Sequence, residues 1–359
     1  MTSPTVDWPL AATTARRLTK PGPEVTAEEA TAAVASLRDA ATRARDHVTD
    51  VTGLRVAGDE APVLIVDRPT WVDATVGSFE ELLRPLTERE VTTSRLTARL
   101  TGIEVGVLLA YLSRRILGQY DPYHEPAGRL LLIAPNIVQA ERDLHVHPGD
   151  FRLWVALHEQ THVVQFTHAP GGEQPWLRTY LREWIAQLVA VTDLDSDTLA
   201  LVARGVAGRG RRTNTGTNTG GGTDGGPGNT AEVSLLDLVQ TPEQRQLVDR
   251  ITGVMSLLEG HADVIMDEVG PGVIPSVSTI RKRFNGRRQR GGLEGVARRV
   301  LGMEAKMRQY REGASFCRAV LARVGMPGLN RVFTSPETLP TMAEILDPAI
   351  WLERVRPRR

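Results

Sequence analysis

The sequence predicts a mainly α-helical protein with a small β-sheet, the α+β class. Over most of the 359 residues, apolar side chains recur at the three- and four-residue spacing of helices. Uninterrupted apolar runs typical of strands occur at residues 63–66 (VLIV) and 130–135 (LLLIAP). The hydrophobic content of 41% is enough to bury a sizeable core. Helix is therefore expected to dominate, with strand as a minor component.

The chain is predicted to begin with an extended arm. Residues 1–25 contain four prolines, which break helices. Thr26 is then a suitable helix N-cap with Glu29 three residues later, and apolar residues recur at helical spacing up to Gly53. A second long helix is expected from about residue 92 to 117.

The remainder is predicted to be a single folded region, residues 26–355, with two lobes. Residues 208–230 are glycine-rich with almost no apolar content, which predicts a flexible loop inserted into one fold. His145 and His147, in the run HVH, are followed at once by Pro148 and Gly149, which favours a loop over a metal-binding strand. Further helices are expected at about residues 154–166, 176–191, 242–268 and 293–324, and after Pro340.

A candidate metal site lies in WVALHEQTHVVQF, where His158, Glu159 and His162 form the pattern His-Glu-x-x-His. On a helix, histidines four residues apart share a face, so both rings can reach one cation at about 2.0–2.1 Å. Glu159 is rotated away from the metal, toward whatever the metal holds, and is placed to act as a base. The alternative is a helix that binds nothing, but the uncharged Gln160 and Thr161 and the apolar flanks disfavour it.

Catalytic zinc needs a third protein ligand, for which there are two candidates. His168 stands where some zinc enzymes have a third histidine, but Gln165 replaces the glycine that such sites require. On an unbroken helix, six residues past His162 is about 240° around the axis, away from the metal. Glu259 is favoured instead, because Asp263, four residues later, shares its face and could accept the free ring N–H of a ligand histidine.

The chain resembles the gluzincin-like branch of the zincin-like zinc metallopeptidases, and within it the actinobacterial family often labelled as associated with deazaflavin coenzyme biosynthesis. The resemblance covers most of the chain and implies a zincin-like fold whose active-site helix carries the His-Glu-x-x-His pattern. It rests on LGQYDPY at 117–123, LLLIAPNI at 130–137, WVALHEQTHVVQF at 154–166, PWLRTYL at 175–181, EGHAD at 259–263 and IRKRFNGRR at 280–288.

The resemblance implies one zinc ion per chain, held by His158, His162 and Glu259, with Glu159 as general base and Asp263 behind the ligands. It also implies that the strand predicted at 130–135 is the edge along which an extended peptide pairs. The function expected is therefore a zinc-dependent hydrolase, specifically a peptidase acting on peptides or proteins. A catalytically idle fold that binds a partner protein is the alternative, which the intact Glu159 disfavours.

Three further residues are candidates for contacting the substrate or the transition state: His261, Tyr180 and Arg281. His261 lies about 200° around its helix from Glu259, which favours a core position. Arg281 belongs to a basic cluster, residues 280–290, which is interpreted as a solvated helix face more readily than as a nucleic-acid site.

Composition excludes several classes of protein. The formal net charge is zero, so no overall field draws the chain to nucleic acid or an anionic membrane. The most apolar window, residues 103–112, is shorter than a membrane span. The N-terminus does not match a secretory signal, and the lone Cys317 is expected to be a buried thiol compatible with a reducing compartment. A cytoplasmic location is expected.

Overall fold

The computed structural model describes residues 6–87, 94–169, 175–191, 241–290 and 303–355. Most of these residues are helical, and they include one three-stranded sheet, which confirms the predicted α+β class. The glycine-rich tract at 208–230 and the first part of the helix expected at 293–324 lie outside the described residues. Within the described part of the chain, no helix has both the length and the apolar character needed to cross a membrane.

The sheet consists of β1 (Val63–Val66), β2 (Gly118–Asp121) and β3 (Arg129–Ile133) in the order β1-β3-β2. Strand β3 runs parallel to β1 and antiparallel to β2. The prediction that 130–135 is an edge strand is therefore wrong, because β3 is paired on both sides. Its continuous apolar run reflects burial on both faces of the sheet, as is typical of a central strand. Among the described strands, β2 is the edge on the other side of β3 from β1.

The sheet separates two apolar clusters. Leu130 and Leu132 of β3 belong to the larger cluster, whereas Leu131 and Ile133 belong to the smaller one. This division follows from the two-residue period of a strand, which points successive side chains to opposite faces. The larger cluster contains buried residues of the helices that carry the predicted metal ligands.

The N-terminal arm is not extended throughout, because residues 8–18 form a helix, α1 (Trp8–Leu18). Asp7 caps this helix by accepting a hydrogen bond from the backbone N–H of Leu10 at 3.0 Å. Pro9 is tolerated because it falls in the first helical turn, where no intrahelical N–H bond is lost. Trp8 is buried in the smaller cluster, so the prediction of an extended segment is wrong for this helix.

The helix predicted after Thr26 is α2 (Ala27–Thr52). Thr26 and Glu29 form the expected capping box, and Gly53 ends the helix with the left-handed φ of 70° that glycine adopts readily. The helix expected at 92–117 is shorter, because α4 begins after the N-cap Ser94 and spans Arg95–Leu112.

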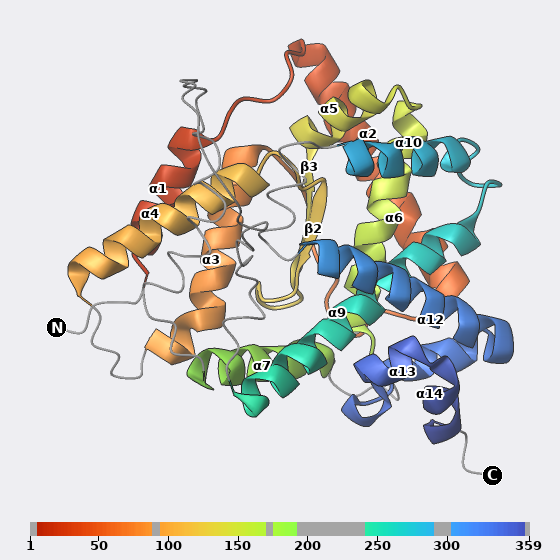
Figure 1. Cartoon of the computed structure of the whole chain (residues 1–359). Coiled ribbons are helices and arrows are strands. Elements are labelled where there is room, and N and C mark those ends of the chain that lie inside the picture. The colour runs from red at the N-terminus through yellow and green to blue at the C-terminus, as the bar shows by residue number, and fades with distance from the viewer. Residues whose placement is uncertain (1–5, 88–93, 170–174, 192–240, 291–302, 356–359) are drawn as a thin grey trace, which may run out of the picture.

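Two long helices cross near the centre of the molecule, α6 (Pro148–Thr167) and α9 (Pro242–Val269) (Figure 1). Helix α6 is buried on nearly all sides, as expected of a helix that is apolar around most of its circumference. His145 caps the C-terminus of the preceding helix and His147 caps the N-terminus of α6. The loop predicted for these two histidines is therefore confirmed.

Of the remaining helices, α3 (Arg68–Thr87) packs against α1 on the side of the smaller cluster, and the others lie around the central pair (Figure 1). These others are α5 (Ala134–Leu144), α7 (Leu177–Val191), α10 (Val277–Arg290), α12 (Met303–Leu329), α13 (Met342–Leu346) and α14 (Pro348–Arg354), with 3-10 turns at Asn330–Phe333 and Pro336–Thr338.

Candidate metal centre

Three side chains from two distant segments converge where α6 and α9 cross. His158 and His162 lie one turn apart on α6, and their Nε2 atoms are 3.2 Å apart. Glu259 of α9 brings Oε2 to 3.4 Å from His158 Nε2 and Oε1 to 4.0 Å from His162 Nε2. The structure thus brings together the predicted ligand set, although His162 and Glu259 are separated by 96 intervening residues in the sequence.

These three residues fit a zinc ion. Their donor atoms all lie within 4.8 Å of one another, and donors around a tetrahedral zinc ion with bonds of about 2.0–2.1 Å are about 3.3 Å apart. Two imidazoles and a carboxylate are also an established catalytic zinc ligand set. The side chains of His158 and Glu259 remain 30% and 23% exposed, so the group opens to solvent on one side. That opening leaves room for water or substrate as the fourth zinc ligand, which a catalytic site requires.

Glu159 lies beside the ligands and is buried, with 7% of its surface exposed. Its carboxylate accepts a hydrogen bond from the backbone N–H of Tyr120 in β2. Gly118, in the same strand, lies so close that a Cβ there would be 2.5 Å from Glu159 Cγ. Burial raises the pKa of Glu159 to about 7; the charge of Glu259 also raises it, while His162 and the Tyr120 N–H lower it. Strand β2 therefore packs against the carboxyl group of Glu159, whose pKa lies near neutral pH.

Asp263 does not occupy the place predicted for it behind the ligands. Its carboxylate lies 2.7 Å from Arg281 Nη1 and 2.8 Å from Arg318 Nη2, so it ties α9 to α10 and α12. The Nδ1 atom of His162 is instead 2.8 Å from Oε1 of Gln165. In the sequence, Gln165 stands out only because it occupies the position of a glycine in related zinc sites. The signal that could have identified it is an amide on the apolar α6, three residues after a ligand and thus on the same side of the helix.

The three candidates for substrate contact have other partners in the described residues. His261 is fully buried, and burial together with His162 lowers its pKa to about 3. Its ring packs against Phe333, in agreement with the predicted core position. Tyr180 packs against other aromatic rings of its own segment. Arg281 is engaged by Asp263 and Asp267. His261 is linked to the ligand His162 through Gln165.

The structure also places His168, the other candidate for the third ligand, and the basic cluster at 280–290. His168 ends α6, and its Nδ1 lies 3.2 Å from the carbonyl oxygen of Arg55, so it is not part of the ligand group. In the basic cluster, Arg283 donates a hydrogen bond to the carbonyl oxygen of Leu144 at 2.9 Å, at the end of α5. Arg283, like Arg281, is thus engaged in packing α10 against its neighbours.

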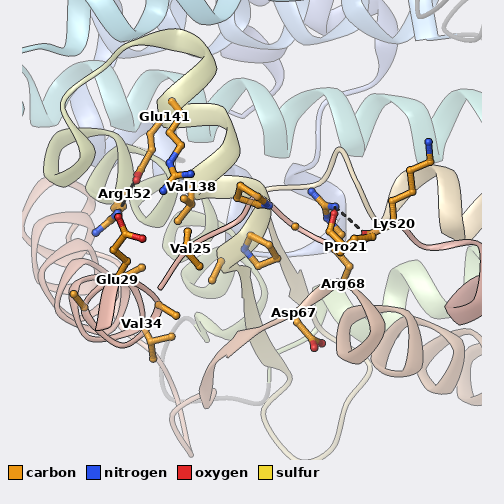
Figure 2. Close-up of a pocket in the computed structure, with 18 of the residues that line it drawn as sticks. Lys20, Pro21, Val25, Glu29, Val34, Asp67, Arg68, Val138, Glu141 and Arg152 are labelled. Atoms are coloured by element: carbon orange, nitrogen blue, oxygen red, sulfur yellow. Dashed lines mark hydrogen bonds and ion pairs between the residues drawn. The ribbon is translucent and has the colours of Figure 1, made fainter. Parts of the chain in front are cut away.

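A cavity of about 800 Å³ lies elsewhere, between the α1–α2 connection, α2, α3 and α5 (Figure 2). None of the metal-site residues lines it. Arg68 donates hydrogen bonds to the backbone carbonyls of Lys20 and Pro21, and Arg152 forms a two-pronged ion pair with Glu141. The Arg68 hydrogen bonds fasten the α1–α2 connection to α3, whereas the Arg152–Glu141 pair ties α6 to α5.

Comparisons with known proteins agree with this geometry. No curated protein matches the chain significantly. Among solved structures, a Chloroflexus aurantiacus protein described as a candidate hydrolase with a novel fold is 29% identical, with a TM-score of 0.67 over 99% of this chain and 100% of that one. Residues 6–352 match the sequence profile of the zincin-like metallopeptidases. The chain therefore belongs to the zincin-like metallopeptidase family.

Proposed function

We propose that this protein is a zinc-dependent peptidase that binds one zinc ion per chain through His158, His162 and Glu259. The observation that carries the proposal is the buried carboxyl group of Glu159 beside a partly exposed His-His-Glu group. The structural relative from Chloroflexus aurantiacus, described as a candidate hydrolase, supports hydrolysis as the reaction class.

Glu159 is the general base in this proposal. Zinc, when bound, supplies a Lewis acid that polarises a carbonyl group and lowers the pKa of water to about 7. The buried carboxylate of Glu159, beside the ligand group, would take a proton from the attacking water and return it to the leaving nitrogen. The Tyr120 N–H fixes the orientation of the Glu159 carboxylate, and Gly118 leaves space for it.

Strand β2 is the proposed binding edge for the substrate. It pairs with β3 through Gly118–Asp121, and its other side is not paired with any described strand. An extended peptide that adds to this edge would form main-chain hydrogen bonds independent of its side chains. Because Gly118 lies against Glu159, such a peptide would pass directly beside the general base. In this proposal the peptide pairs with β2 and not with residues 130–135, the strand expected from the sequence.

The proposal is tested by turnover of a fluorogenic peptide library by the zinc-loaded protein. Glu159→Gln is expected to reduce turnover by about 10²- to 10⁴-fold, the usual contribution of general base catalysis, while zinc content is unchanged. Glu268→Gln, the same chemical change at an exposed position of α9, is the matched control and should keep full activity. Equal activity of Glu159→Gln and wild type would refute the role of Glu159. Failure of the zinc-loaded wild type to cleave any peptide would favour a partner-binding protein instead.

A further inference from the structure

The side-chain amide of Gln165 joins the two halves of the metal centre. Gln165 is 2% exposed and lies where α6 meets α9. Its Nε2 atom is 2.9 Å from the carbonyl oxygen of Leu258 and 3.0 Å from His261 Nδ1, and its Oε1 is 2.8 Å from His162 Nδ1. Three of its neighbours therefore lie within hydrogen-bonding distance, and they come from both helices.

The orientation of this amide follows from its partners. A backbone carbonyl oxygen can only accept a hydrogen bond, so the Gln165 atom facing Leu258 must be the NH₂ group. The second hydrogen of that NH₂ points to His261 Nδ1, which accepts it. Both hydrogens are then used, and the remaining atom, Oε1, must face His162. Rotating the amide by 180° would place two oxygens, both of them acceptors, 2.9 Å apart, where they repel each other.

This orientation determines which ring nitrogen of His162 carries a proton. Because Oε1 of Gln165 can only accept, Nδ1 of His162 must be the donor. A neutral imidazole with its hydrogen on Nδ1 has a free lone pair on Nε2. Nε2 is the atom that faces His158 and Glu259.

We propose that Gln165 is a positioning residue that holds His162 in its metal-binding tautomer and fixes α6 relative to α9. The inference rests on the proposed zinc site. Leu258 directly precedes Glu259, so the hydrogen bond from Gln165 also restrains the backbone that carries the third ligand. One amide thus couples a ligand on α6 to the ligand on α9, and it accepts the ring N–H of a ligand histidine, the role predicted for Asp263.

The test compares zinc dissociation constants, measured by competition with a chelator, for the wild type and for Gln165→Met. Methionine has a similar shape and fills the space but removes all three hydrogen bonds. The dissociation constant is expected to rise by about 10- to 100-fold, as is usual when a group that orients a metal ligand is lost. Gln160→Met is the matched control: Gln160 lies on the same helix, is 4% exposed, and donates a hydrogen bond to the Ala41 carbonyl at 3.2 Å, away from the ligands. The zinc affinity of this control should change little.

A second measurement reports the tautomer itself. In the zinc-free wild type labelled with ¹⁵N-histidine, long-range proton–nitrogen spectra at alkaline pH should place the His162 hydrogen on Nδ1; a His162→Asn sample identifies the signal. In Gln165→Met, that preference should be lost. A hydrogen on Nε2 in the wild type would overturn the inference, even if the methionine variant fails to fold.

The outcomes separate this inference from the function on which it rests. Absence of zinc binding by the wild type refutes the zinc site, whatever the tautomer of His162. If the wild type binds zinc and Gln165→Met binds it equally tightly, the zinc site stands and the positioning role of Gln165 is refuted. Equal losses of affinity in Gln165→Met and Gln160→Met would also refute it, since any buried amide of α6 would then have the same effect.

Discussion

The substitution Glu159→Gln is expected to change how the stability of the zinc-free protein depends on pH. Glu159 is buried without a cationic side chain bonded to it in the described structure, and burial is the largest cause of its raised pKa. Glutamine has nearly the same shape and carries no charge. The variant therefore removes the cost of ionising this group while leaving the packing against Gly118 and Tyr120 in place.

The magnitude follows from the two pKa values. A pKa of about 7 in the folded chain, against an ordinary value of 4.5, corresponds to about 3 kcal/mol of unfolding free energy. The folded chain holds the proton at pH values where the unfolded chain has lost it. Stability from this group is thus fully present below about pH 4.5 and is lost as the pH rises through about 7. Relative to wild type, Glu159→Gln should gain about 3 kcal/mol between these limits.

Urea unfolding of both proteins in the presence of a chelator, at a series of pH values across this range, measures the effect. The quantity of interest is the difference in unfolding free energy between variant and wild type, because contributions of titrating groups that do not interact with Glu159 cancel. Glu268→Gln, at an exposed site, should give a difference that does not vary with pH. A pH-independent difference for Glu159→Gln as well would refute the claim that burial raises the pKa of Glu159.

Three further predictions concern the surroundings of the site. Gly118→Ala should lower turnover by about 100-fold with zinc retained, because its Cβ would displace the Glu159 carboxylate; full activity in a peptidase assay would contradict this. Asp263→Asn should keep zinc affinity at the wild-type value, because Asp263 pairs with Arg281 and not with a ligand; a weakened affinity in chelator competition would restore its predicted role. Deleting residues 208–230 should leave zinc content unchanged in elemental analysis, because the tract has almost no apolar residues with which to pack; loss of zinc would show that it is part of the fold.

The elements and ligands that follow from local rules could be predicted from the sequence. The capping box at Thr26 and the glycine at position 53 define α2 because both act within one helical turn. His158 and His162 share a face because of helical geometry alone. For Glu259, spacing offered no constraint, and only the nearby Asp263 and the resemblance to a family singled it out.

The features that were missed depend on contacts between distant segments. Whether residues 130–135 form an edge or a central strand depends on β2 and β1, which come from elsewhere in the chain. The role of Gln165 depends on the Leu258 carbonyl, which lies on another helix. In residues 1–25, the four prolines favour an extended arm, but Asp7 caps α1 and Pro9 occupies a position that a helix tolerates.

The central claim is that His158, His162 and Glu259 together hold one zinc ion, and the most direct measurement is the zinc content of the purified protein by elemental analysis. The wild type is expected to contain one zinc ion per chain, and His158→Ala and Glu259→Ala should each lose it, because the three donor atoms lie within 4.8 Å of one another. Stoichiometric zinc in Glu259→Ala, held with wild-type affinity, would contradict the claim.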